Sequence, residues 1–333
     1  MKEKVTLPSV IFGTSCLGNL YEALTFNTKL AIVRECVANA PNTFVTFDSA
    51  GKYGAGLALE MLGTCLTELD IPKEKVLISN KLGWIRTPLI GDEPTFEKGV
   101  WKDLKFDAVQ KISYDGILEC YYQGNDLLGK YEAQMVSVHD PDEYLIAAEN
   151  ESDRQKRYKD ILEAYSALKQ LKKEGKVESI GIGSKDWRVI ERISKDVDLD
   201  WVMVANSLTI HSHPKELFSF IETLNKKGIE VINSAVFNGG FLIGSDYYNY
   251  QLVDQESEAG KALYEWREKF YSLCKTYNIS PAEACFNYGF NIPGVVAVAL
   301  NTTKPEKIKQ NVAMATRLIP KAFWENMTAE GLL

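Results

Sequence analysis

The sequence lacks any apolar run that approaches the length of a membrane span, since the longest, at 294–300, has only the length of a strand. The first ten residues carry two lysines, but no long apolar segment follows them, so we expect no signal peptide. None of the six cysteines forms a C-x-x-C pair. Scattered cysteines without a secretion signal predict reduced thiols and a cytoplasmic protein with no membrane partner.

Positive charge is also in short supply. The net charge of −7 excludes nucleic acid or an anionic membrane surface as the main partner. Low-complexity tracts and internal repeats are absent, while the hydrophobic content of 45% is ample for a globular core. The 333 residues allow one large barrel or two ordinary domains, and they leave the oligomeric state open.

Eight short runs rich in Val and Ile are candidate strands. Several are apolar at consecutive positions, which is typical of strands that are buried on both faces. The eight runs are 9–13, 43–49, 76–81, 135–139, 177–183, 201–206, 229–235 and 295–300.

The segments between these runs have helical periodicity, most clearly at 57–69, 157–176 and 213–228. Alternation of eight strands with helices predicts an α/β fold, a (β/α)₈ TIM barrel formed by a single domain over 1–333. A doubly wound sheet is the alternative. Its G-x-G-x-x-G fingerprint is matched only weakly, by Gly181 and Gly183 late in the chain.

Two long stretches, 83–106 and 239–261, interrupt the alternation. Both follow strands, so we expect them to be loops on the C-terminal face of the barrel, where long loops form lids or pocket walls. In the first stretch, Trp84 and Trp101 either line a substrate pocket or pack the loop onto the barrel. The tyrosines at 246–250 in the second stretch form either a lid or an amphipathic loop.

Polar residues stand at the carboxyl ends of three successive candidate strands. The second run ends near Asp48, with Tyr53 five residues later, the third ends at Lys81 and the fourth at His139. Each residue alone is more often a turn or surface residue than a catalytic one. The ends of neighbouring barrel strands converge, however, so we expect all four side chains in one pocket.

This set of residues suits proton transfer to or from an oxygen. A phenol with a pKa near 10 becomes a useful acid or base when a nearby ammonium stabilises its anion. We expect Lys81 to lower the pKa of Tyr53 in this way, with Asp48 keeping the lysine charged and oriented. His139 can hydrogen-bond the substrate oxygen.

Five stretches carry a resemblance to the aldo-keto reductases that spans residues 12–312. The stretches are FDSAGKYGAG, SNKLG, VSVHDPDEY, KVESIGIGS and KPEKIKQNV. The resemblance identifies Asp48, Tyr53, Lys81 and His139 as the catalytic tetrad of that family. It implies an NAD(P)-dependent oxidoreductase in which hydride passes between the nicotinamide C4 and a carbonyl carbon, with Tyr53 as general acid in reduction and general base in oxidation.

A finer resemblance is carried by HDPD and NSAVFNGGFL. These stretches look like the branch that oxidises sugars at the anomeric carbon, the threo-aldose, L-fucose and L-galactose 1-dehydrogenases, with pyridoxal dehydrogenase nearby. The implied small-molecule substrate is an aldose or another aldehyde. Which one, and the direction in the cell, are left open.

The resemblance also implies a set of cofactor residues. Gly13 and Thr14 would line the nicotinamide end, and Ser184 would hold the carboxamide where Gly183 cannot. Pyrophosphate would lie near Ser234, Gly239 and Gly240, and adenine near Gln310 and Asn311. The loop with Thr302, Thr303 and Lys304 lacks the arginine that commonly binds a 2′-phosphate, which favours NAD, although Lys304 could serve NADP as a point charge.

Other functions remain open at this stage. The first alternative is a general NADPH-dependent aldehyde or ketone reductase. The second is a cofactor-binding regulatory subunit with slow turnover, such as an ion-channel partner. An isomerase that acts on a phosphorylated sugar with Lys81 and His139 is weaker, because it would leave the adenine-type segment at 309–311 without a purpose.

For two further features we favour a structural role over a functional one. His211 and His213 could chelate a metal, but no third ligand lies within sequence reach and Pro214 opens a helix, so we favour a loop role and no metal. Cys16 lies near the expected nicotinamide end, where a small buried apolar role is favoured over a redox role.

Overall fold

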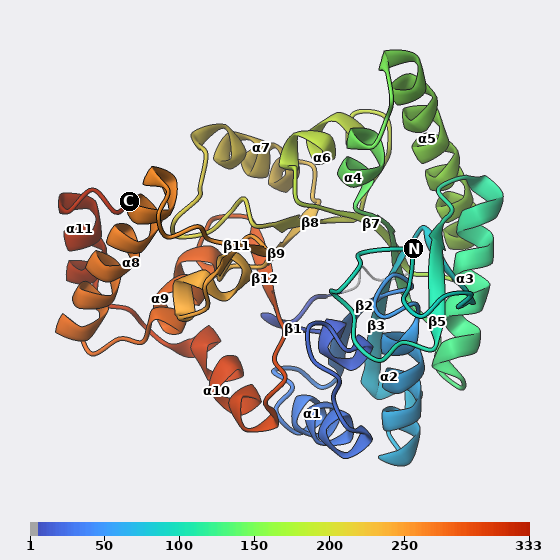
Figure 1. The fold of residues 1–333 in the computed structure, drawn as a ribbon, viewed down its shortest axis with the longest axis horizontal. Coiled ribbons are helices and arrows are strands. Elements are labelled where there is room, and N and C mark those ends of the chain that lie inside the picture. Colours follow the sequence, from blue (N-terminus) through green and yellow to red (C-terminus); the bar gives the residue numbers. More distant parts are fainter. Residues whose placement is uncertain (1–5) are drawn as a thin grey trace.

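The computed structural model describes residues 6–333. The expectation about a signal peptide therefore falls partly on residues 1–5, which lie outside the described part. Within that part, eight parallel strands close into a barrel in the order β1, β12, β9, β8, β7, β6, β3, β2 (Figure 1). The strands are β1 (Val10–Gly13), β2 (Val45–Ala50), β3 (Val76–Leu82), β6 (Met135–His139), β7 (Ser179–Ser184), β8 (Trp201–Ala205), β9 (Glu230–Ser234) and β12 (Val295–Leu300). Each coincides with a predicted strand, which confirms the (β/α)₈ prediction.

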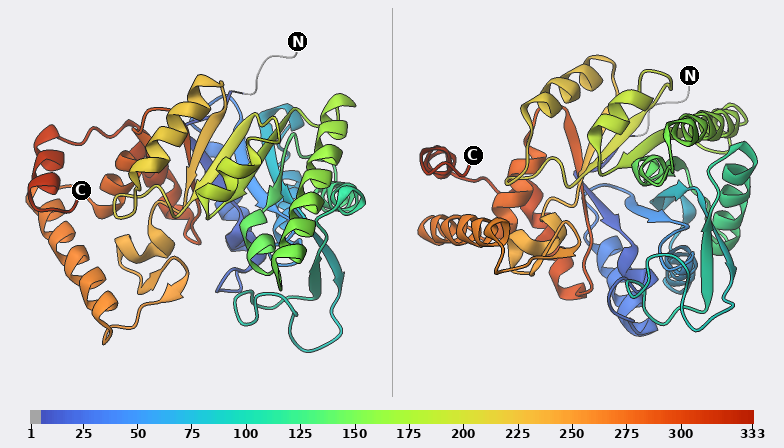
Figure 2. Two further views of the ribbon diagram at one scale, coloured as in Figure 1. Left: turned by 90° about the horizontal axis from the view of Figure 1, so that it is seen from above. Right: turned by 45° about the horizontal axis from the view of Figure 1, so that its top comes forward.

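Helices surround this barrel, and α8 and α11 extend to one side of it (Figure 2). The α-helices are α1 (Phe26–Ala38), α2 (Leu57–Glu68), α3 (Tyr114–Leu128), α4 (Pro141–Ile146), α5 (Glu151–Lys173), α6 (Trp187–Ile193), α7 (Lys215–Lys226), α8 (Glu258–Thr276), α9 (Pro281–Phe290), α10 (Ile308–Ala313) and α11 (Lys321–Ala329). Short 3₁₀ helices are η1 (Ser15–Gly18), η2 (Lys73–Lys75), η3 (Asn238–Ile243), η4 (Pro305–Lys307) and η5 (Met314–Thr316). Helix α5 begins earlier than its apolar stripe predicts, because Asn150 accepts a hydrogen bond from the Asp153 amide and caps it there.

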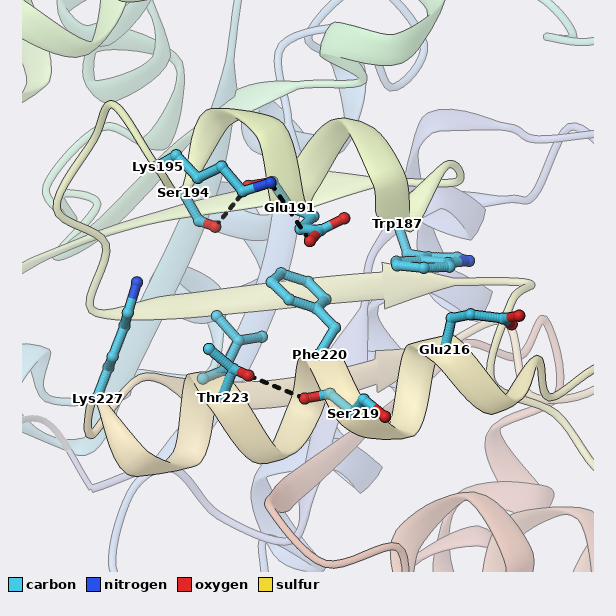
Figure 3. A pocket seen from close by; sticks show the side chains of 10 residues that line it. Trp187, Glu191, Ser194, Lys195, Glu216, Ser219, Phe220, Thr223 and Lys227 are labelled. Atoms are coloured by element: carbon cyan, nitrogen blue, oxygen red, sulfur yellow. Dashed lines mark hydrogen bonds and ion pairs between the residues drawn. The ribbon is translucent and has the colours of Figure 1, made fainter.

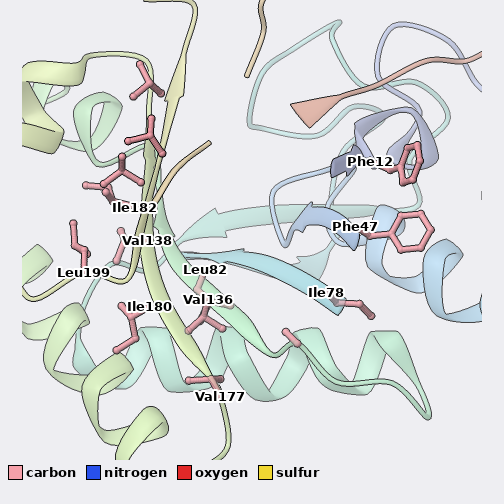
Figure 4. Packing of buried hydrophobic residues seen from close by; sticks show 14 of the residues in the cluster. Phe12, Phe47, Ile78, Leu82, Val136, Val138, Val177, Ile180, Ile182 and Leu199 are labelled. Atoms are coloured by element: carbon pink, nitrogen blue, oxygen red, sulfur yellow. The ribbon is translucent and has the colours of Figure 1, made fainter. Parts of the chain in front are cut away.

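Apolar side chains pack on both the outer and the inner surface of the barrel wall. Between strands and helices lies a continuous apolar cluster, part of which is shown in Figure 4. The barrel interior is filled by a second set that includes Ile11, Met135 and Trp201. A Cβ on Gly181 would lie 2.1 Å from the Trp201 ring, so this glycine makes room for the indole. Packing thus explains Gly181 of the weak G-x-G match, whereas a Cβ on Gly183 would make only ordinary contacts.

The two stretches expected to be loops contain strands, which corrects that prediction. Strands β4 (Trp84–Pro88) and β5 (Phe106–Gln110) form an antiparallel hairpin, and β10 (Tyr247–Tyr248) pairs with β11 (Gln251–Leu252). The Gln123 side chain exchanges two hydrogen bonds, of 2.6 and 3.1 Å, with the backbone of Arg86. Helix α3 therefore supplies hydrogen bonds to an edge strand, and this support cannot be read from local sequence.

No helix within residues 6–333 is both long and apolar enough to cross a membrane. All six cysteines are buried as free thiols. Burial raises the pKa of the Cys16 thiol to about 12, so its thiolate is disfavoured and the apolar interpretation fits best.

Candidate active site

Three of the predicted catalytic side chains lie at the carboxyl ends of adjacent strands. The barrel order places β2 beside β3 and β3 beside β6, with Ala50 opposite Lys81 and Leu82 opposite Val138. Asp48, Lys81 and His139 are all buried. The barrel geometry thus brings them together although 91 positions separate the first from the last.

Tyr53 completes the group from the turn that follows β2. The Lys81 ammonium donates to the Asp48 carboxylate, and the same nitrogen lies 4.8 Å from the centroid of the Tyr53 ring. The Tyr53 and His139 rings meet edge to face with centroids 5.5 Å apart. A Cβ on Gly18 would lie 2.8 Å from the Tyr53 carbonyl carbon, so η1 packs directly on the turn that holds the phenol.

The pKa of Tyr53 lies well above its ordinary value of 10, first because the phenol is buried and then because of the charges of Asp48 and Asp140. This reverses the expected lowering by Lys81. The main physical reason is burial, which disfavours the phenolate, and the negative charges of Asp48 and Asp140 act in the same direction. The isolated chain therefore holds Tyr53 as a neutral proton donor.

His139 is held neutral. Burial, followed by the charges of Lys81 and Lys52, keeps its pKa well below the ordinary 6.5. The Asp140 Oδ2 lies 3.7 Å from the His139 Nε2, and Nδ1 is buried without a partner in the described chain. A carboxylate beside Nε2 favours the tautomer with its proton on that atom, so the ring can donate one hydrogen bond to a substrate oxygen.

The two predicted substrate residues, Trp84 and Trp101, both lie beside this group. The Trp101 ring is 5.8 Å from the Tyr53 ring, and its Nε1 donates to Glu97 at 2.6 Å. The Trp84 ring packs on Phe96 at 5.7 Å, and its buried Nε1 has no partner within residues 6–333. The two indoles thus form an aromatic wall with one unused donor.

The sequence did not predict a cluster of ion-paired side chains at the mouth of the site. Lys52 is buried and contacts Glu97 at 2.8 Å and Glu143 at 2.9 Å. Burial alone would lower the pKa of Lys52, but these carboxylates raise it above its usual value. Lys185 contacts Glu143 and lies 3.5 Å from Asp140. The available sequence signal was Lys52, which stands directly before Tyr53. Its partners Glu97 and Glu143 lie 45 and 91 positions away in the sequence.

Some of the residues predicted for the nicotinamide end and the adenosine end line one small pocket. Gly13, Thr302 and Asn311 line it together with Asn301 and apolar residues of β1, α1 and β12. Thr14 follows Gly13 but does not line this pocket, and its hydroxyl donates to the Asp48 carbonyl at 3.1 Å. The pocket thus brings Gly13 together with residues predicted for the adenosine end, while the four predicted catalytic residues lie outside its lining.

The remaining residues predicted for the adenosine end lie in the loop after β12 and on α10. The Thr302 hydroxyl accepts from the Lys304 amide at 3.1 Å, and the Lys304 side chain is exposed. Gln310 is exposed on α10, with its Oε1 3.4 Å from the Lys307 Nζ, and Thr303 is half-buried.

The predicted carboxamide and pyrophosphate residues have contacts of their own. Ser184 donates to the Asp186 carbonyl at 3.1 Å, and Ser234 donates to the Val204 carbonyl at 3.4 Å. Gly239 and Gly240 both adopt positive φ, and Cβ atoms there would meet the backbone of Tyr250 and the side chain of Ser245. The chain at 245–250 thus packs over these glycines, which accounts for both of them without a ligand.

Asn206, which the sequence reasoning missed, follows β8 with a left-handed backbone at φ 61°. Its side-chain oxygen is buried and has no partner in the described part of the chain. It stands one strand from Ser184, so β7 and β8 together offer a hydroxyl and a free amide acceptor. The available sequence signal was an asparagine at the end of the candidate strand that follows Ser184.

The other aromatic and histidine motifs have structural partners. The His211 Nδ1 lies 2.9 Å from the Tyr248 hydroxyl, and the His213 Nδ1 lies 3.0 Å from the Thr209 carbonyl. The two histidines thus face different neighbours, and residues 6–333 contain no cluster of three or more metal-ligating side chains. Tyr247 stacks on Tyr21 at 6.1 Å, so the 246–250 stretch bridges to the loop after β1.

A groove also lies on the outer surface, between α6 and α7. Phe220 of α7 points toward α6 there, among charged and hydroxyl side chains such as Glu191 and Lys195 (Figure 3). None of the predicted site residues lines it.

Comparisons with known proteins show which family and which proteins the chain resembles. The family model described as Aldo/keto reductase family matches residues 9–329. Pyridoxal 4-dehydrogenase from Microbacterium luteolum is 25% identical and aligns over 99% of this chain and 95% of its own length. D-threo-aldose 1-dehydrogenase from a Pseudomonas species is 23% identical over 99% and 95%, and L-galactose dehydrogenase from Arabidopsis thaliana is 23% identical over 93% and 85%.

Among solved structures, the holo form of an aldo-keto reductase from Bacillus halodurans has the same fold. It superposes with a TM-score of 0.68 at 19% identity, covering 99% of this chain and 96% of the other.

Proposed function

The chain belongs to the aldo/keto reductase family and is an oxidoreductase, and from this premise we propose that it transfers hydride between a nicotinamide dinucleotide and the anomeric carbon of an aldose. Tyr53 gives or takes the proton. The observation that carries this proposal is the Asp48–Lys81 ion pair directly beneath Tyr53, with His139 at the edge of the phenol.

The four predicted catalytic residues have different roles in proton transfer. In reduction, the substrate oxygen gains the Tyr53 proton as the carbonyl carbon gains hydride, and the neutral His139 holds that oxygen with a hydrogen bond. In oxidation the phenolate must take the proton back, and Lys81 then stabilises the anion. Asp48 accepts a hydrogen bond from Lys81 and orients it throughout.

The residues present fit a nicotinamide dinucleotide. Asn301, Thr302 and Asn311 line one pocket with neutral amide and hydroxyl groups, which can hydrogen-bond such a ligand. Asn206 offers an unused acceptor beside Ser184 for a carboxamide. When bound, the cofactor supplies the site that accepts or donates hydride. We propose NAD as the preferred cofactor, because Thr302 and Thr303 stand where an arginine would bind the 2′-phosphate of NADP.

The second candidate is a general NADPH-dependent aldehyde or ketone reductase. The aromatic wall of Trp84 and Trp101 favours it, because two indoles can stack on an aromatic aldehyde as well as on a sugar face. The exposed Lys304 is the residue that would serve the 2′-phosphate.

The test is a matrix of NAD⁺ and NADP⁺ against free aldoses (L-fucose, D-arabinose, L-galactose and L-xylose), with reduced nicotinamide followed by absorbance. We expect rapid reduction of NAD⁺ with one stereochemical series. Silence across the sugars, together with NADPH-dependent reduction of simple aldehydes, would replace the sugar proposal with the second candidate. Bound nicotinamide without turnover in either direction would overturn both.

A further inference from the structure

We propose that Asp140 contacts the substrate, accepting a hydrogen bond from a hydroxyl on the carbon next to the reacting carbon. The enzyme would thereby select 2-hydroxy carbonyl compounds over their 2-deoxy analogues. This inference rests on the proposed function and adds a specificity-determining residue to it.

The backbone of Asp140 is strained. Its φ of 43° and ψ of 59° place a non-glycine residue in the left-handed region, and proline at 141 disfavours helical backbone in the residue before it. Strain of this kind persists where the surrounding structure requires it, and it is concentrated at functional sites. Here it follows directly on His139, at the carboxyl end of β6.

This conformation turns the Asp140 carboxylate toward the catalytic group. Its Oδ2 lies 3.7 Å from the His139 Nε2, and its charge acts on Tyr53. The side chain is largely shielded, with 14% of its surface exposed.

The carboxylate keeps acceptor capacity for a ligand. Its contact with the Lys185 Nζ, at 3.5 Å, is the longer of the two that the lysine makes, since Glu143 holds the same nitrogen more closely. Side-chain hydrogen bonds to Asp140 are absent from the described residues. Anchoring Lys185 therefore does not account for the strained backbone.

A second observation points to a ligand at the same place. The His139 Nε2 faces the Asp140 carboxylate at 3.7 Å, which is beyond hydrogen-bond distance, so the two groups do not satisfy each other. A donor and an acceptor 3.7 Å apart can each hold one of two oxygens on adjacent carbons. His139 would hold the reacting oxygen, and Asp140 would accept from the neighbouring hydroxyl.

The experiment compares an aldose that the wild-type enzyme uses with its 2-deoxy analogue, and glycolaldehyde with acetaldehyde. The variants are Asp140→Gly, which fits the backbone and removes the carboxylate, and Asp140→Asn, which keeps a neutral acceptor. Asp198→Asn, an exposed carboxylate distant from the site, is the control. Circular dichroism and nicotinamide binding by fluorescence verify that each variant is folded.

We expect Asp140→Gly to lower kcat/KM for the 2-hydroxy substrates about 100-fold and for the deoxy substrates less than threefold. Asp140→Asn should lose about tenfold on the 2-hydroxy substrates alone. Equal losses on both members of each pair would reduce Asp140 to a positioning residue and overturn the inference while leaving the proposed function intact. Wild-type enzyme that binds nicotinamide but turns over none of these compounds would reject the proposed function, and the inference with it.

Discussion

At the scale of single residues, the site depends on which charges are already paired. The Lys81 ammonium is paired with Asp48, and burial together with the charges of Asp48 and Asp140 keeps the pKa of the Tyr53 phenol raised in the isolated chain. His139 is neutral for the complementary reason, since two lysines and burial oppose its protonation. Both candidate hydrogen-bond donors to the substrate oxygen are therefore uncharged.

Removal of the phenolic oxygen should stop the chemistry and spare binding. We expect Tyr53→Phe to lower kcat by about 10²- to 10⁴-fold while nicotinamide affinity changes less than threefold, because the proton donor is lost but the pocket remains. Steady-state kinetics and fluorescence titration measure the two quantities. Tyr122→Phe, on the exposed face of α3, is the control, and turnover above a few per cent in Tyr53→Phe would contradict the assignment.

The neutral state of His139 predicts how stability depends on pH. The native pKa is depressed, so below pH 6.5 the unfolded chain binds a proton that the native chain does not. The free energy of unfolding should then fall as the pH drops, by at most about 1.4 kcal/mol per pH unit from this residue. His139→Gln should lack this contribution.

Urea unfolding at pH 7.5, 6.5 and 5.5 tests this directly, with the variant subtracted from the wild type. His211, which is also shifted downward in pKa, is present in both proteins and cancels. A difference that stays constant across the three pH values would mean that His139 is not held neutral.

At the scale of elements, the sequence predicted the eight barrel strands because their apolar runs are local signals. It also predicted the convergence of Asp48, Lys81 and His139, since barrel geometry converts three strand ends into one pocket. The β4–β5 hairpin was missed because its hydrogen bonds to Gln123 come from a helix. The partners of Lys52 were missed because they lie on a distant loop and on helix α4, and nothing local distinguishes Glu97 or Glu143 from surface carboxylates.

Lys52 connects three of these elements, namely the turn after β2, the loop between β4 and β5, and helix α4. We expect Lys52→Met to keep the apolar stem but to release the loop and helix α4, because two ion pairs are lost. The free energy of unfolding should fall by about 1–2 kcal/mol, since both carboxylates are about one-third exposed and partly screened.

Hydrogen exchange should accelerate in residues 94–104 of Lys52→Met and remain unchanged in the barrel strands. Lys226→Met, which breaks an exposed pair on α7, should alter neither quantity. Uniformly faster exchange across the barrel would show that Lys52 supports the fold as a whole.

At the scale of the whole molecule, excess negative charge continues into the mouth of the site. There, carboxylates outnumber lysines by four to three: Asp48, Glu97, Asp140 and Glu143 against Lys52, Lys81 and Lys185. Each of these lysines is paired, so none is left to bind an anionic substrate.

A phosphorylated substrate should therefore be a poor one. We expect kcat/KM for D-glyceraldehyde 3-phosphate to be at least about tenfold below that for D-glyceraldehyde, because like charges repel at the mouth. Added salt should narrow the gap by raising only the value for the phosphorylated compound. Equal efficiency without a salt effect would mean that an unassigned cation serves the phosphate.

The molecule is also joined end to end, because β1 pairs with both β2 and β12. We propose on this ground that the chain is one domain, since the barrel is incomplete without its first and last strands.

That same pairing has a consequence during synthesis. The ribosome must release residue 300 before β12 can lie between β1 and β9. Until then the nascent chain carries two open strand edges, and open edges invite pairing with other chains. Closure of the barrel by β12 thus ends the exposure of both edges, and we expect the tendency to aggregate to be greatest just before that strand emerges.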